Sequence, residues 1–318
     1  MYYAPLDFTK LKRYSALSRP SRVSVAAEAI PHRAGGRFSD FLDGLPDALA
    51  ARDIRSVSES IAGAHRRKRP VILGMGAHPL KVGLAPIIIN LMQRGIISAL
   101  ACNGACIVHD FEIAFMGRTS EDVAGELADG SFGMAEETGS MLNEAVNSGV
   151  RKGYGIGRAV GEYIDFSDFP FKAKSVFREA RRLEVPTSVH VAIGTDILHM
   201  HPEADGALIG EGSLRDFKLF SSVVAELEGG VYVNLGSAVL LPEVFLKAIS
   251  VVRNLGHRVE EFSTVNMDFI QHYRPAVNVL RRPTAKKGRS FALTGHHEIM
   301  FPLLAAMVIE ALDGGHAD

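Results

Sequence analysis

The stretch IISALACNGACIVHDFEIAFMG, residues 96–117, decides the fold. It opens with an apolar run from Ile96 to Ala101, which is typical of a buried strand. A turn of small residues, Asn103-Gly104-Ala105, follows, and a largely apolar helix begins after it. A strand, a tight turn and a helix start are the geometry with which nucleotide-binding α/β folds cradle a phosphate. The stretch therefore predicts a nucleotide-binding α/β protein.

The same alternation of strand and helix extends outward in both directions. Residues 38–64 have the apolar spacing of one long helix, and helices are also expected at 82–94, 214–227 and 242–255. The expected strands are Val71–Leu73, Ile96–Ala101, Ser188–Ile193, Val231–Leu235, Ser263–Val265 and Arg289–Leu293. This order predicts an α/β fold with a doubly wound, mainly parallel, Rossmann-like sheet. We expect an N-terminal arm with helices at 1–66 and a single domain at 67–318, with a helical insertion at 119–182.

Composition narrows the classes of partner. The chain has 318 residues, of which 35 are basic and 36 acidic, and this balance argues against nucleic acid or a membrane surface as the main partner. No apolar run is long enough to span a bilayer. Two cysteines, Cys102 and Cys106, cannot build a disulfide framework and fit a reducing, cytoplasmic setting.

Small and polar residues follow five of the expected strands. In a parallel sheet, ligands bind beyond the carboxyl ends of the strands, where glycines let backbone amides approach a pyrophosphate and an acid can hold a ribose hydroxyl. These residues are the expected cofactor site. They are Gly74, Gly76, His78, Asn103, Gly104, Asp196, Gly236 and Ser237.

Histidines and acids at the strand ends form a second group. His109, Asp110, His296 and His297 each follow a strand, so we expect them to converge on one cavity and to transfer protons. Histidines beside carboxylates also suit a metal ion, although no tight ligand spacing such as HExxH is present. The metal reading is the weaker of the two, and no metal ligand is assigned.

Several of these segments together resemble the deoxyhypusine synthase family. The resemblance runs from about residue 69 to residue 312. Asn103-Gly104-Ala105-Cys106 resembles the family's glycine turn, and Gly194-Thr195-Asp196 resembles its Thr-Asp-Gly strand end. Leu235-Gly236-Ser237-Ala238 resembles its Leu-Gly-Gly-Gly turn, and Phe301-Pro302-Leu303-Leu304 matches its FPLL helix. The family's reactive lysine lies in a Trp-Gly-Lys segment, and this chain has no tryptophan, which makes it a divergent relative.

The resemblance implies a Rossmann-like domain, an NAD site between subunits and a homotetramer. It implies an NAD-dependent enzyme that acts on a small amine or polyamine, by aminobutyl transfer or by amine dehydrogenation. Lys286 or Lys287 would then carry a substrate imine, and Glu112 and Asp268 would hold ammonium groups. Two other functions stay open. One is a metal-dependent hydrolase or lyase that uses the histidines, and the other is a non-catalytic nucleotide-binding protein.

Overall fold

The structure is a computed structural model that describes residues 3–313. The contacts divide the chain into two units, Met1–Ala51 and Arg52–Asp318. The site described below lies in the second unit.

The first unit is an irregular arm. It contains three short 3-10 turns, η1 (Phe8–Lys10), η2 (Ala16–Ser18) and η3 (Val25–Ala27), and one short helix, α1 (Phe38–Asp43). The single helix expected over residues 38–64 is wrong, because α1 ends at Asp43 and α2 (Leu49–Arg66) begins separately. Pro46 explains the break, because the residue before a proline avoids the helical conformation and proline itself has no N–H to donate.

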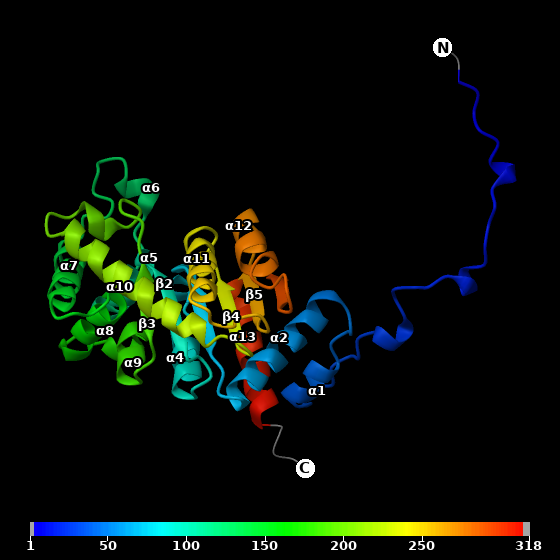
Figure 1. Ribbon diagram of the computed structural model, residues 1–318, viewed down its shortest axis with the longest axis horizontal. Coiled ribbons are helices and arrows are strands. Elements are labelled where there is room, and N and C mark those ends of the chain that lie inside the picture. The colour runs from blue at the N-terminus through cyan, green and yellow to red at the C-terminus, as the bar shows by residue number, and fades with distance from the viewer. Residues whose placement is uncertain (1–2, 314–318) are drawn as a thin grey trace. The chain divides into compact units, whose positions relative to one another are not determined.

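The second unit is built on one parallel sheet of six strands. The order across the sheet is β3-β2-β1-β4-β5-β6, and every neighbouring pair is parallel. Figure 1 shows this succession from β3, in green, to β5, in yellow-orange. The strands are β1 (Val71–Met75), β2 (Ala99–Asn103), β3 (Thr187–His190), β4 (Val231–Leu235), β5 (Ser263–Asp268) and β6 (Arg289–Thr294).

Helices connect the strands throughout the second unit. Five of them, α5 to α9, lie between β2 and β3 in the chain, and α7, α8 and α9 appear in green near β3 in Figure 1. The helices that follow α2 are α3 (His78–Lys81), α4 (Ala85–Gln93), α5 (Gly104–Met116), α6 (Val123–Glu126), α7 (Glu136–Arg151), α8 (Ile156–Phe166), α9 (Val176–Arg182), α10 (Gly206–Ala225), α11 (Leu240–Asn254), α12 (Tyr273–Pro275) and α13 (His297–Asp313). Two 3-10 turns, η4 (Lys172–Lys174) and η5 (Ile197–Met200), and a π-helix, η6 (Ala276–Arg281), complete the unit.

Apolar side chains on both faces of the sheet hold these helices. Strand β1 is fully buried, as expected of a central strand in a parallel sheet. On one face, Ile72 and Tyr232 join a core with Phe220 of α10 and Phe245 of α11. The rings of Tyr232 and Phe245 stack 3.9 Å apart. The opposite face is covered by α2, α4 and α13, which contribute apolar side chains at Ile61, Leu91, Phe301 and Leu304. Helices therefore cover both faces, and the predicted doubly wound parallel fold is confirmed.

The two edges of the sheet differ. At β3, helix α10 supplies polar side chains to the outer edge. Asp216 Oδ2 accepts the Val189 N–H at 2.8 Å, and Ser213 Oγ donates to the Val189 carbonyl at 3.2 Å. Asp216 also accepts the Gly157 N–H at the start of α8, at 2.9 Å. At the other edge, four of the six residues of β6 are exposed.

No helix in residues 3–313 combines the length and the apolar character that crossing a membrane requires.

Candidate functional site

The order of the strands determines where a ligand can enter. Strand β1 lies between β2 and β4, and the chain leaves β1 toward β2 but leaves β4 toward β5. In parallel sheets of this kind, ligands bind at the carboxyl ends of the two strands whose following loops depart in opposite directions. Gly76 and Ala77 follow β1 there, and Gly236 and Ser237 follow β4. We refer to this place as the switch-point crevice.

Two histidines meet in the switch-point crevice. His78 begins α3 directly after β1, and His297 begins α13 directly after β6. Their Nδ1 atoms lie 2.8 Å apart, although the two residues are far apart in the chain. His297 is 1% exposed, and its Nε2 lies 3.2 Å from the Met267 carbonyl and 3.6 Å from Asp268 Oδ1. The ring of Phe269 lies 6.0 Å from each imidazole.

These contacts fix the protons on both rings. A carbonyl oxygen only accepts, so His297 Nε2 carries a proton and donates it to Met267. The Nδ1 of a neutral His297 then accepts, and the proton in that contact belongs to His78 Nδ1. Burial lowers the pKa of His297 more than the nearby Asp268 carboxylate raises it, which keeps the ring neutral at pH 7. The remaining nitrogen, His78 Nε2, has a lone pair to offer to a ligand.

Protein atoms lie close to each glycine of the expected cofactor site. A Cβ at Gly236, whose φ is +66°, would lie 2.5 Å from His297 Cε1, and one at Gly76 would lie 2.5 Å from the Gly236 carbonyl oxygen. A Cβ at Gly74 would clash with the Tyr232 hydroxyl, and one at Gly104 would clash with Asp196 Oδ2. These glycines therefore let neighbouring strands, rings and loops approach one another at this edge.

Buried amides hold the loops around the switch-point crevice. Asn234 and Asn266 are fully buried, and Asn234 Nδ2 donates to the Ser237 carbonyl at 2.9 Å and to Asn266 Oδ1 at 2.7 Å. Asn266 Nδ2 donates to Gln271 Oε1 at 2.7 Å. Ser237 Oγ accepts the Leu241 N–H at 3.2 Å in the first turn of α11. The network fixes the loop after β4 against the loop after β5.

A second polar group lies on α5, beside the same edge. His109 Nδ1 lies 2.6 Å from Thr119 Oγ1, and Thr119 donates its hydroxyl proton to Glu112 Oε2 at 2.5 Å. Thr138 of α7 donates to Glu112 Oε1 at 3.0 Å. The Glu112 carboxylate is buried, so the two hydroxyls replace the water it has lost.

A cavity of about 200 Å³ lies over this group. His109 and Glu112 line it together with Lys81, Glu121 and Asp196. Burial lowers the pKa of His109, the Lys81 ammonium lowers it further, and the Glu112 carboxylate opposes both. We refer to this place as the α5 cavity. Helix α3 is one turn long and has His78 of the switch-point crevice at its first residue and Lys81 of the α5 cavity at its last, so it borders both places.

Asn103 and Asp196 both bind the first turn of α5. Asn103 Oδ1 accepts the Cys106 N–H at 3.2 Å as the N-cap of the helix. Asp196 accepts the Ala105 N–H, and burial raises the pKa of Asp196 against that hydrogen bond. A carboxylate at this position is favourable because the N-terminus of a helix attracts negative charge.

Asp110 points away from the α5 cavity and binds the start of α9. It accepts the Ser175 hydroxyl at 2.5 Å, the Val176 N–H at 2.7 Å and the Phe177 N–H at 3.3 Å. Burial raises the pKa of Asp110 to about 6, against the lowering effect of these donors. All of its contacts serve to hold α9 on α5.

The remaining expected site residues are more exposed. Lys286 and Lys287 pair with Glu260 at 2.6 Å and Glu261 at 3.3 Å. Both lysines precede the start of β6, so they lie at the amino ends of the strands, at the opposite edge from the switch-point crevice. His296 is exposed, and its ring stacks on Phe269 at 6.0 Å.

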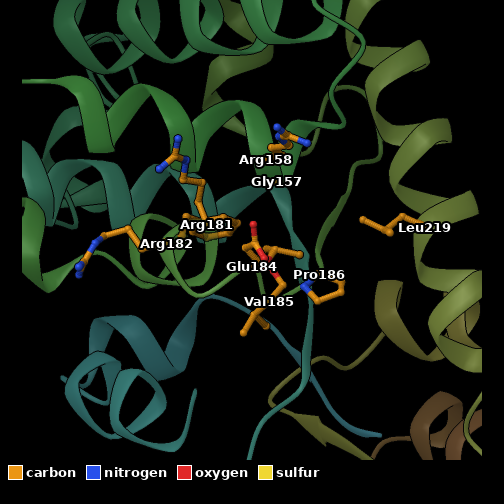
Figure 2. Close-up of a pocket in the computed structure, with 10 residues that line it drawn as sticks. Gly157, Arg158, Arg181, Arg182, Glu184, Val185, Pro186 and Leu219 are labelled. Carbon is orange, nitrogen blue, oxygen red and sulfur yellow. Dashed lines mark hydrogen bonds between the residues drawn. The ribbon is translucent and has the colours of Figure 1, made fainter. Parts of the chain in front are cut away.

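Another hollow, of about 410 Å³, lies beside the start of β3 and is shown in Figure 2. Arg181 and Arg182 lie on one side of it and Leu219 on the other (Figure 2). Arg181 pairs with Asp165 at 2.8 Å and Arg182 with Glu179 at 3.0 Å, and Arg178 pairs with both of these carboxylates, so three guanidinium groups share two carboxylates. Within the described part of the chain, no three His, Cys, Asp or Glu side chains are placed to hold a metal ion.

Four members of the α5 cavity and its network were not identified from the sequence: Lys81, Thr119, Glu121 and Thr138. Lys81 had a usable signal, since it follows His78 by one helical turn and Pro79 marks a helix start. No local pattern in the sequence indicates Thr119 or Thr138, because a loop and a separate helix bring their hydroxyls to Glu112.

No protein-family model matches the sequence, and no curated protein sequence matches it either. Solved structures do match the fold. ArgZ, a cyanobacterial arginine dihydrolase, matches with 17% identity over 83% of this chain and a TM-score of 0.51. AgrE, solved in a ternary complex with ornithine and NAD⁺, matches with 15% identity over 84% of this chain, also at 0.51.

A protein from Entamoeba histolytica assigned as a deoxyhypusine synthase matches with 12% identity over 87% of this chain and 95% of its own, at a TM-score of 0.51. The chain spans only 33% of ArgZ and 34% of AgrE. At these identities the likeness establishes the fold, and the fold is shared with a deoxyhypusine synthase-like protein.

Proposed function

We propose that this protein is an NAD-dependent enzyme that acts on a small amine, with the dinucleotide bound across the switch-point crevice. The observation that carries the proposal is the strand order β3-β2-β1-β4-β5-β6, because this is the arrangement in which dinucleotides bind between the first and fourth strands. A fold neighbour, AgrE, has been solved with NAD⁺ and an amino acid bound.

The residues at the crevice fit a dinucleotide. Helix α11 has 15 residues and begins at this edge, and because Ser237 accepts the Leu241 N–H and Pro242 has no N–H, its first turn offers the Leu240 N–H to a phosphate. His78 Nε2 accepts a hydrogen bond from a ribose hydroxyl or a carboxamide N–H, and His297 holds the ring in that orientation. Phe269 and Ile270, both exposed beside His78, offer an apolar surface to a flat ring.

NAD would supply a hydride acceptor, and the chain supplies groups for the amine. The α5 cavity lies across α3 from the crevice and contains His109, Glu121 and Asp196, all able to accept hydrogen bonds from an ammonium group. No lysine imine is needed for amine dehydrogenation, and Lys286 and Lys287 have no part in this proposal.

Calorimetric titration with NAD tests the proposal. We expect wild type to bind NAD, and His78→Ala to bind it about two- to tenfold more weakly, because the lost hydrogen bond is worth about 0.5–1.5 kcal/mol. The matched control is His257→Ala, which removes an exposed histidine between α11 and β5, at the amino edge of the sheet. Wild-type protein that does not bind NAD at millimolar concentration would overturn the cofactor assignment.

Turnover separates an enzyme from a binding protein. NADH formation should be followed with a panel of diamines, polyamines and basic amino acids. NAD binding without turnover of any of them would favour the non-catalytic nucleotide-binding alternative.

A further inference from the structure

The α5 cavity has an uncompensated cation among its carboxylates. Lys81 is exposed at the cavity, and within residues 3–313 no carboxylate lies within ion-pair distance of its ammonium group. Its charge is nevertheless felt in the cavity, because it lowers the pKa of His109. A lysine in this position is a ready partner for an anionic group on a ligand.

Apart from the hydroxyls of Ser120 and Thr195, the other polar side chains at the cavity can serve as acceptors. Glu121 Oε2 already accepts the Gly133 N–H at 2.9 Å, which leaves its other oxygen for a ligand. Asp196 adds a second carboxylate. Both Glu112 oxygens are already taken by Thr119 and Thr138, so its charge attracts a cation without contacting it.

His109 is also an acceptor, and its orientation is set by its neighbours. Thr119 has one hydroxyl proton and donates it to Glu112, so in the contact with His109 the threonine oxygen must accept. The proton is therefore on His109 Nδ1, and Nε2 has the lone pair. Since Nδ1 is occupied, Nε2 is the nitrogen that a molecule in the cavity can reach.

We propose that the α5 cavity binds a small α-amino acid with a basic side chain, with Lys81 pairing with its carboxylate and His109 Nε2, Glu121 and Asp196 accepting its ammonium hydrogens. This rests on the proposed function and narrows its substrate from any amine to one that also has a carboxylate. A volume of about 200 Å³ is below the about 300–1,000 Å³ of pockets for drug-sized ligands, so the ligand is small. A simple diamine would leave Lys81 unpaired and bring another ammonium group near it.

Two ligands that differ only in the carboxylate test this. L-Ornithine is 1,4-diaminobutane with a carboxylate on one terminal carbon. We expect wild type to bind L-ornithine at least about tenfold more tightly than 1,4-diaminobutane, since one charge-assisted contact is worth about 1.5–3 kcal/mol. In Lys81→Met the two affinities should come within about twofold of each other, through weaker binding of L-ornithine.

Lys218→Met is the matched control, because Lys218 is an exposed lysine of α10 that does not line the α5 cavity. It should keep the wild-type preference. The proposal is overturned if wild type prefers the diamine, binds neither compound at millimolar concentration, or keeps its preference after Lys81→Met. The same variants titrated with NAD separate the two proposals: Lys81→Met should leave NAD affinity unchanged, and a failure to bind NAD in wild type bears on the cofactor alone.

The orientation of His109 has its own test. Nitrogen-15 spectra report which imidazole nitrogen is protonated, at a pH where the ring is neutral. We expect wild type and Thr119→Ser to show protonated Nδ1 at His109, and Thr119→Val to show a mixture of both tautomers together with several-fold weaker binding of L-ornithine. Protonated Nε2 in wild type would overturn the assignment of His109 as an acceptor.

Discussion

Two imidazoles at the carboxyl edge of the sheet, His78 and His109, are held in the same way. Each has its Nδ1 engaged by a protein group, His297 in one case and Thr119 in the other, and each keeps Nε2 for a ligand. In both cases the last acceptor is fixed by the fold: the Met267 carbonyl behind His297 and the Glu112 carboxylate behind Thr119. In each case a chain of hydrogen bonds that begins at a buried acceptor therefore fixes which nitrogen of the outer imidazole is protonated.

Among single residues, Asp216 should dominate the pH dependence of stability in the neutral range. Burial raises the pKa of Asp216 to about 7, against the lowering effect of three backbone N–H donors, whereas an unfolded aspartate titrates near about 4. The folded state therefore binds the proton more tightly. Stability from this group is fully present below about pH 4 and is lost as the pH rises through about 7.

Urea unfolding of wild type and Asp216→Asn across this range measures the effect. Between about pH 5 and pH 8 the free energy of unfolding of wild type should fall by about 2–3 kcal/mol relative to that of Asp216→Asn. Parallel pH profiles for the two proteins would show that Asp216 does not titrate in this window.

Among the elements, the short ones determine the site, and they were the hardest to predict. Strand β4 was expected with its observed bounds, because a buried apolar run between glycines has few other readings. The helix expected over residues 82–94 is α4, whereas α3, the turn that positions His78 and Lys81, was not expected. A four-residue helix is too short for apolar periodicity to reveal, and tertiary packing decides whether it forms.

The partners of the site residues depended on the fold as well. His109 and Glu112 were both expected at the site in separate roles, and they come together because residues three apart share a helix face. That His297 would meet His78 followed from no local pattern, since β4 and β5 lie between β1 and β6 in the sheet, and the contact is made by the segments that follow β1 and β6. Asp110, one position from His109, lies on a different face of α5 and binds α9 instead.

The turn after β4 offers a controlled substitution. Gly236→Ala places a methyl group at φ +66° and 2.5 Å from His297 Cε1, whereas Gly83→Ala places one at φ +80° with no atom within 4 Å. Both variants suffer left-handed strain of about 1–2 kcal/mol, and only Gly236→Ala adds overpacking of about 1–3 kcal/mol. Chemical denaturation should rank Gly236→Ala as the less stable by that second amount.

Displacement of His297 should also release His78. In Gly236→Ala the His78 tautomer, read from nitrogen-15 shifts, should become mixed, and in Gly83→Ala it should stay as in wild type. Equal losses of stability in the two variants would mean that His297 moves away from the added methyl group without lowering the free energy of unfolding.

In the whole molecule, several exposed apolar side chains lie on the loops and at the helix start that follow the strands at the carboxyl edge. They lie after four different strands: Ile193 after β3, Val239 after β4, Phe269 and Ile270 after β5, and Ile299 after β6. Apolar groups that recur around one edge are typical of a surface that another molecule covers. We propose that a second copy of this chain covers it, as part of a tetramer.

Light scattering at micromolar concentration should give four times the mass of one chain. Replacing both Phe269 and Ile270 with serine should lower the mass, because it removes apolar surface from that edge. Leu255→Ser is the control, since Leu255 is an exposed leucine that follows α11 at the amino edge of the sheet. A wild-type monomer would contradict the proposal, and so would equal dissociation in the control.

The two edges of the sheet differ in whether a further strand can pair with them. At β3 the N–H and carbonyl of Val189 already form hydrogen bonds with Asp216 and Ser213 of α10. Helix α10 therefore satisfies backbone groups that a neighbouring strand would otherwise satisfy. At β6 the outermost backbone stays open to water. A foreign strand, whether from another copy or from a misfolded chain, therefore finds a template beside β6 and none beside β3. Further strands, whether in an ordered assembly or in an aggregate, are therefore added beside β6.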